Sequence, residues 1–152
     1  MITWVDWAAA ARTNGAEIHI DSSRQKVLVV DDNRDACESL QVLFEMENCQ
    51  VSTAYDGQEA VIAAQQAMPD LIVMDLGMPH MDGYEAARRI RCQPGSKEVL
   101  MIAVTGWGQS DARQRTMEAG FDHHLIKPVD FTEIKQLANA QLLKRQQLRS
   151  AS

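Results

Sequence analysis

Three aspartates stand directly after short apolar runs in this chain of 152 residues. Asp31 and Asp32 follow the run Val27–Val30, and Asp75 follows the run Leu71–Met74. Short apolar runs bounded by turn residues are typical of strands that are buried on both faces of a parallel sheet. Because parallel strands end at one edge, we expect the three carboxylates to lie together there, where open α/β sheets place their ligands.

Two further apolar runs end on a hydroxyl and on an ammonium group. The run Leu100–Val104 is followed by Thr105, and Leu125–Ile126 is followed by Lys127. Carboxylates about 4 Å apart repel one another by about 4 kcal/mol at an effective dielectric constant of about 20, so cations must offset the cluster. Lys127 supplies one positive charge. A divalent ion with oxygen ligands supplies two more, and Mg²⁺ fits best because it takes one or two carboxylates and keeps waters for a phosphoryl group.

This set of groups predicts phosphoryl transfer. A carboxylate nucleophile, a magnesium ion, a lysine and a hydroxyl are what that reaction requires. We predict that Asp75 attacks phosphorus and becomes an aspartyl phosphate. The sequence offers no competing Ser/His/Asp or Cys/His set and no GxxxxGK[ST] or GxGxxG phosphate-binding turn. Each residue alone would usually be a helix cap or a solvated side chain, so the prediction rests on their joint occurrence.

Strand and helix patterns alternate with short connections from Lys26 onward, which is typical of repeated βαβ units. Three helices are predicted to begin at an aspartate paired with a glutamate three residues later, as in a capping box. Besides the four runs above, we expect a helix after the first strand that ends near Asn48, a weaker strand over 51–55, and a helix over 110–119 with few apolar residues that Gly120 ends. The three capped helices begin at the pairs Asp56/Glu59, Asp82/Glu85 and Asp130/Glu133. Pro69 ends the first of these three helices, and the last one fades after Leu143.

The predicted organisation is an N-terminal extension over 1–25, one domain over 26–145, and a C-terminal tail over 146–152. In the extension, Thr3 and Asp6 are spaced as a capping box and Trp4 and Trp7 share a helical face, which predicts a short helix up to Arg12. Packing on the domain or a frayed leader is the more usual role for such a helix, and a partner contact is the alternative.

Composition excludes several classes of function. The net charge of -6 argues against nucleic-acid binding, since such domains are usually basic. Three cysteines without a CxxC pair predict reduced thiols rather than disulfides or a zinc site. No apolar run approaches the roughly 20 residues that cross a bilayer, and no basic segment precedes an apolar stretch at the N-terminus, so we expect a cytoplasmic protein without a membrane partner.

Five motifs together resemble the receiver domain of two-component response regulators over about residues 26–143. The resemblance implies a flavodoxin-like, doubly wound α/β fold, with a five-stranded parallel sheet in the order 2-1-3-4-5 and five flanking helices. The motifs are Val29-Val30-Asp31-Asp32-Asn33, Met74-Asp75-Leu76-Gly77-Met78-Pro79, Met81-Asp82-Gly83-Tyr84, Val104-Thr105-Gly106 and Lys127-Pro128.

The resemblance also implies a role for each site residue. Asp75 would take a phosphoryl group from the phosphohistidine of a histidine kinase or phosphotransfer protein, in a regulatory domain that phosphorylates and dephosphorylates itself with magnesium. The ion would be held by Asp31, Asp32, Asp75 and the backbone carbonyl of Gly77. Thr105 and Lys127 would contact the phosphoryl oxygens, and the bond between Lys127 and Pro128 would be cis.

Two positions deserve separate expectations. His124 stands three residues before Lys127, where receivers usually carry a Tyr or Phe that swings inward, so the switch is expected to involve Thr105 and His124 without the usual aromatic swing. Adjacent strand residues point to opposite faces, which argues against a metal pair of His123 and His124. Trp107 and the side-chain-free Gly77 are expected to set the lifetime of the phosphoryl group, with Trp107 shielding it from water.

A switch at this edge is expected to move the loop before the helix over 110–119, whose face we predict binds an unknown downstream protein. The leading hypothesis is a single-domain response regulator without an output domain, and a receiver excised from a hybrid sensor histidine kinase is the alternative. An Asp-nucleophile phosphatase is disfavoured because Gly77 stands where its second acid is required. A pseudo-receiver is disfavoured because no acidic or cationic member of the set is missing.

Overall fold

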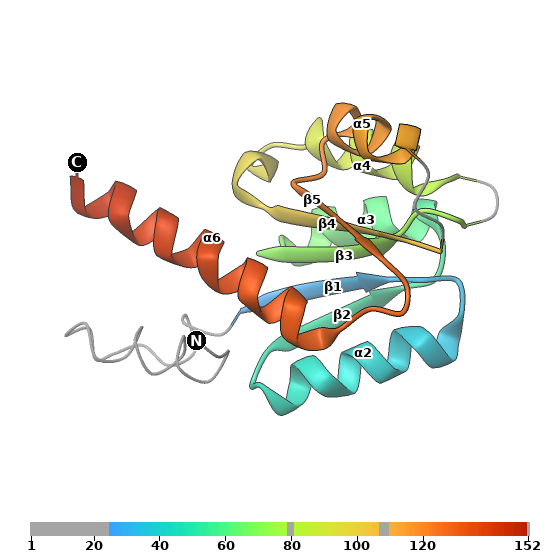
Figure 1. The fold of residues 1–152 in the computed structure, drawn as a ribbon, viewed down its shortest axis with the longest axis horizontal. Helices are drawn as coiled ribbons and strands as arrows, with labels where there is room; N and C mark the ends of the chain where they lie inside the picture. Colours follow the sequence, from blue (N-terminus) through green and yellow to red (C-terminus); the bar gives the residue numbers. More distant parts are fainter. Residues whose placement is uncertain (1–24, 79–80, 107–109, 152) are drawn as a thin grey trace. The chain divides into compact units, whose positions relative to one another are not determined.

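Five parallel strands form a single sheet in the computed structural model, which describes residues 25–78, 81–106 and 110–151 (Figure 1). The strand order is β2-β1-β3-β4-β5, which confirms the expected topology. The strands are β1 (Lys26–Val30), β2 (Gln50–Ala54), β3 (Leu71–Asp75), β4 (Leu100–Thr105) and β5 (His123–Ile126). The helix and strand predicted within residues 1–25 lie outside the described residues.

The sheet is buried on both faces, as the apolar runs predict. Leu28, Ile72 and Met101 belong to a core that also contains side chains of α3 (Gly57–Ala67) and α4 (Gly83–Arg91). The opposite face is met by α2 (Arg34–Met46), where the thiol of Cys37 lies 3.5 Å from the carbonyl oxygen of Val29. Figure 1 shows α2 on one side of the sheet and α3 and α4 on the other. All five residues of β3, the central strand, are buried.

Capping residues set the helix ends. Asp56 and Asp82 accept hydrogen bonds from the backbone N–H three residues on, at 2.8 Å and 2.9 Å, and so begin α3 and α4 as predicted. After α2 the backbone of Asn48 turns left-handed (φ 65°), and Gly120 does so after α5 (Ser110–Ala119; φ 110°). A single 3₁₀ turn, η1 (Ser96–Glu98), leads into β4.

Internal contacts group residues 25–129 into one compact unit, and α6 (Phe131–Ala151) belongs to a second unit. The predicted end of this helix near Leu143 is wrong, since the helix continues to Ala151, while the division into a domain and a tail over 146–152 stays a prediction. Lys, Arg, Gln and Leu all favour helix, and no Gly or Pro interrupts the segment. Among the described residues, no helix has the length and apolar character to cross a membrane.

Candidate functional site

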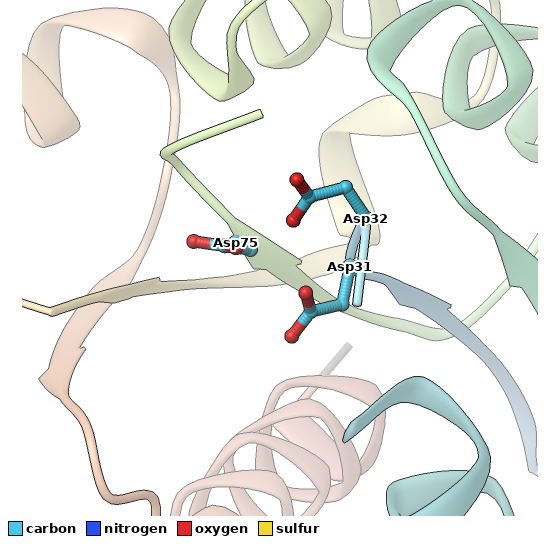
Figure 2. Close-up of side chains that lie close together, drawn as sticks. All are labelled: Asp31, Asp32 and Asp75. Atoms are coloured by element: carbon cyan, nitrogen blue, oxygen red, sulfur yellow. The ribbon is translucent and has the colours of Figure 1, made fainter. Parts of the chain in front are cut away.

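Three carboxylates converge at the carboxyl edge of the central strands. Asp75 is the last residue of β3, and Asp31 directly follows β1, whose Val30 pairs with Met74. One ligand oxygen from each of Asp31, Asp32 and Asp75 lies within 4.8 Å of the others, and Figure 2 shows the three side chains projecting into the same region. Asp31 and Asp75 are each 7% exposed, whereas Asp32 is exposed. The sheet therefore places the three predicted acids together.

Backbone amides hold the two buried carboxylates in place. The N–H of Asn33 donates to Asp31 Oδ1 at 2.9 Å, and the N–H of Gly77 donates to Asp75 Oδ1 at 3.1 Å. Asn33 also caps α2, because its side-chain oxygen accepts from the N–H of Ala36 at 3.2 Å. The chain thus turns away from each aspartate while its carboxylate stays directed into the cluster.

Lys127 supplies the cation of the cluster. Its Nζ lies 3.3 Å from Asp75 Oδ2 and 3.6 Å from Asp31 Oδ2. Its backbone N–H donates to the carbonyl of Thr105 at 2.7 Å, and its bond to Pro128 is cis. Burial alone would lower the pKa of Lys127, but the charges of Asp75 and Asp31 outweigh it and raise that pKa above its usual value.

The cluster carries more negative than positive charge. Burial raises the pKa of Asp31 above its usual value, and the charges of Asp75 and Asp32 raise it further, against the opposing effects of the Asn33 amide and Lys127. Two oxygens bound to one Mg²⁺ ion are at most about 4.2 Å apart, so a spread within 4.8 Å needs only small side-chain rotations. Of the described His, Cys, Asp and Glu side chains, only these three gather closely enough to hold a metal ion. The donor set fits magnesium.

Thr105 and His124 make a direct contact that the sequence did not indicate. The Oγ1 atom of Thr105, at the end of β4, lies 2.9 Å from Nε2 of His124 on β5. Burial lowers the pKa of His124, and the positive charge of Arg113 on α5 adds to this effect. A cavity of about 240 Å³ adjoins this imidazole and is lined by Arg113, Thr116, Met117, Phe121, Asp122, His123 and His124.

Arg91 is a structural residue that sequence reasoning missed. Its guanidinium donates to the carbonyl of Gly120 at 2.8 Å and pairs with Asp122 at 3.0 Å. Asp122 in turn accepts from the N–H of Met101 at 2.9 Å. These bonds fix the start of β5 against β4 and α4, and so fix the strand that carries His124 and leads to Lys127. Arg91 and Asp122 are 31 positions apart, so no local pattern could have indicated the contact.

Gly77 leaves space beside Asp75, since among the described residues a Cβ atom built there would meet only Asp75 Oδ1, at 3.9 Å. Trp107, the predicted shield of the phosphoryl group, lies outside the described residues, as does Pro79.

The three cysteines are free thiols, as expected. Burial raises the pKa of Cys37 to about 11, which leaves this thiol a poor nucleophile.

Known proteins share both the sequence pattern and this fold. The sequence profile of the response regulator receiver domain matches residues 27–139. The transcriptional regulatory protein PrrA of Mycobacterium leprae is 35% identical over 123 residues, which are 81% of this chain and 52% of PrrA. This chain therefore spans about half the length of that relative.

Two solved structures are informative. The receiver domain of the sensor histidine kinase PA1611 from Pseudomonas aeruginosa PAO1, which has a magnesium ion coordinated in its active site cleft, is 30% identical with a TM-score of 0.71 over 78% of this chain and 97% of that one. The receiver domain of the Saccharomyces cerevisiae response regulator Ssk1, solved with the histidine phosphotransfer protein Ypd1, is 29% identical with a TM-score of 0.67 over 73% of this chain and 83% of that one. By sequence and by fold, then, the chain belongs to the response regulator receiver domains of two-component signalling.

Proposed function

We propose that this receiver accepts a phosphoryl group on Asp75 from the phosphohistidine of a histidine kinase or of a phosphotransfer protein. The observation that carries the proposal is the meeting of Asp31, Asp32, Asp75 and Lys127 at one edge of the sheet. The two similar receivers, one solved with magnesium and one with a phosphotransfer protein, support it. The proposal holds equally for a single-domain regulator and for a receiver within a hybrid kinase, because the acceptor chemistry is the same.

The proposed reaction is a substitution at phosphorus. A carboxylate oxygen of Asp75 forms a bond to phosphorus while the bond between phosphorus and the imidazole nitrogen of the donor breaks, and the electron pair of that bond leaves with the imidazole. Lys127 Nζ lies 3.3 Å from Asp75 Oδ2 and would neutralise an oxygen of the transferred group. The hydroxyl of Thr105 would donate to another of these oxygens.

Magnesium would be held by Asp31, Asp32, Asp75 and the Gly77 carbonyl, and when bound it would neutralise charge on the phosphoryl oxygens. Without it, a dianionic phosphoryl group would have to approach three carboxylates opposed by a single lysine. We therefore expect phosphorylation to require a divalent cation.

Intact mass spectrometry after incubation with Mg²⁺ and acetyl phosphate tests the proposal. We expect the protein to gain one phosphoryl group. This gain should not occur when magnesium is chelated beforehand, nor in Asp75→Asn. Asp56→Asn is the matched control, because it makes the same chemical change at a helix cap where Asn also serves. Gain of the group by Asp75→Asn, or no gain by the unaltered protein, would refute the assignment.

We further propose that the face formed by α5 and β5 binds the downstream protein. The link from Asp75 to this face runs through Thr105, which bonds to His124 beside the α5 cavity. Met117 on α5 and Ile126 on β5 expose 69% and 53% of their surface, so both elements offer apolar area to a partner. When beryllofluoride, a phosphoryl mimic, is added, the rate of amide hydrogen exchange should change in residues 113–126 and remain constant in α2. A change of the same size in both regions would count against this face.

A further inference from the structure

The hydrogen bond between Thr105 and His124 joins the predicted phosphoryl-binding hydroxyl to a group that can titrate. Ala103 pairs with His124 across the β4–β5 ladder, and Thr105 lies two residues farther along β4. Side chains two residues apart point to the same face of a sheet, so the hydroxyl and the imidazole emerge side by side. Their separation of 2.9 Å between Oγ1 and Nε2 is that of a direct hydrogen bond.

The donor inventory of this pair changes when Asp75 is phosphorylated. A threonine hydroxyl has one proton to donate and lone pairs to accept with. In the unphosphorylated protein it can donate that proton to Nε2 of a neutral imidazole. If it instead donates to a phosphoryl oxygen, as the proposed function requires, it can only accept from His124, and Nε2 must then carry a proton. A neutral imidazole meets this need by moving its one proton from Nδ1 to Nε2, whereas a protonated imidazole carries N–H groups on both nitrogens. Added negative charge nearby favours the protonated form.

We propose that His124 is a proton-linked positioning residue: phosphorylation of Asp75 turns the Thr105 hydroxyl toward the phosphoryl group, and the His124 imidazole takes up a proton on Nε2 to keep its bond to that hydroxyl. The inference rests on the proposed function and extends it, since it makes the switched state of the receiver sensitive to pH. In the protonation step the lone pair of Nε2 forms an N–H bond to a proton from solvent, and no other covalent bond changes.

The charges around His124 set the direction of this coupling. On β4 the facing group is the uncharged hydroxyl of Thr105, and on α5 it is the cation Arg113. Asp122 and His123 line the same cavity, and Asp122 is already paired with Arg91. Burial and Arg113 lower the pKa of His124, so the unphosphorylated protein holds this imidazole neutral at neutral pH.

Phosphorylation shifts that balance toward the protonated form. The phosphoryl group carries nearly two negative charges in place of the single charge on the Asp75 carboxylate, and Asp75 pairs with Val104, the neighbour of Thr105. A protonated imidazole donates a charge-assisted hydrogen bond, which is stronger than a bond between neutral groups. We therefore expect the pKa of His124 to rise on phosphorylation. By linkage the reverse also holds: protonation of His124 strengthens binding of the phosphoryl group or its mimic by the same factor.

The test is an NMR titration of the histidine ring resonances in the full chain with Mg²⁺, with and without beryllofluoride. We expect the mimic to raise the pKa of His124 by about one unit, which corresponds to about tenfold in affinity. His123 is the internal reference, because it neighbours His124 on β5 but points to the opposite face of the sheet from Thr105. Assignment uses His124→Gln and His123→Gln.

A second measurement separates coupling from a purely structural role. Beryllofluoride affinity should increase as the pH falls from about 8 to about 5.5 by more in the unaltered protein than in His124→Gln, whose amide can hydrogen-bond but cannot titrate. His123→Gln should behave like the unaltered protein. If the mimic binds with magnesium but leaves the pKa of His124 unchanged, the proton linkage is wrong and the proposed function stands. If the mimic does not bind at all, the proposed function itself fails.

Discussion

Removing one carboxylate of the acidic cluster should stabilise the protein while weakening its hold on magnesium. Asp31→Asn is the sharpest form of this change, because an amide oxygen can still accept the hydrogen bond from the N–H of Asn33. One carboxylate oxygen from each of the three acids lies within 4.8 Å of the others, so each of the two repulsions on Asp31 is about 3.5 kcal/mol at an effective dielectric constant of about 20. Attraction to Lys127 at 3.6 Å is worth about 4.6 kcal/mol on the same scale.

These values leave a net repulsion of about 2 kcal/mol on Asp31, and exposure of Asp32 to solvent reduces it. We therefore expect Asp31→Asn to raise the free energy of unfolding by about 1 kcal/mol in the presence of a chelator. The pH dependence has a definite sign. Because the pKa of Asp31 is raised in the folded state, the protein is penalised when this carboxyl ionises, so the gain should be present at neutral pH and vanish as the pH falls below the ordinary value for Asp.

Urea denaturation followed by circular dichroism measures both effects, with Asp35→Asn as the control. Asp35 lies in the first turn of α2, is exposed, and gives the same change in charge. Its replacement should cost up to about 1 kcal/mol through the helix dipole. Magnesium at about ten times its dissociation constant should stabilise the unaltered protein and Asp35→Asn by about 1.4 kcal/mol, and Asp31→Asn by much less. Loss of stability in Asp31→Asn, or equal stabilisation of all three proteins by magnesium, would refute the reasoning.

Three further predictions concern the frame of the site. Gly83→Ala should lower the free energy of unfolding by about 1–3 kcal/mol, because the new Cβ would lie 2.9 Å from the backbone of Leu76. Thermal denaturation measures this loss, and the control Gly77→Ala should show little change in stability because its new Cβ has space. Asp82→Ala should cost about 1 kcal/mol in urea denaturation by removing the cap of α4, whereas Asp82→Asn should not, and equal losses would contradict the capping role. Folding lowers the pKa of His124, so the unfolded chain binds a proton more readily than the folded one. The unaltered protein should therefore lose stability relative to His124→Gln as the pH falls through about 6.5. If stability depends on pH in the same way in both proteins, this prediction is wrong.

The sheet and the acidic cluster could be predicted because their signals are local. Each buried strand is a short apolar run, and parallel pairing brings the ends of these runs to one edge whatever the details of packing. Asp31 and Asp75 are 44 positions apart in sequence, and the parallel pairing of β1 with β3 brings them together. Capping pairs fixed the starts of α3 and α4 in the same way, since the side chain and the amide that it binds are three residues apart.

What could not be predicted depends on side-chain orientation between distant elements. The bond from Thr105 to His124 requires the register of β4 against β5, and the ion pair of Arg91 with Asp122 requires the packing of α4 beside the start of β5. The end of α6 also differs from the prediction, because a polar, basic segment without an apolar stripe resembles a solvated tail in sequence. Its residues favour helix without contributing a regular apolar stripe, so periodicity gave no signal where propensity did.

The central claim is that Asp75, rather than another acid of the cluster, carries the phosphoryl group. Reduction with borohydride converts an aspartyl phosphate to homoserine, and peptide mass spectrometry then locates it. After incubation with Mg²⁺ and acetyl phosphate, the account predicts homoserine at position 75 and aspartate at positions 31 and 32. Homoserine at 31 or 32, or its absence from a protein that has gained a phosphoryl group, would contradict it.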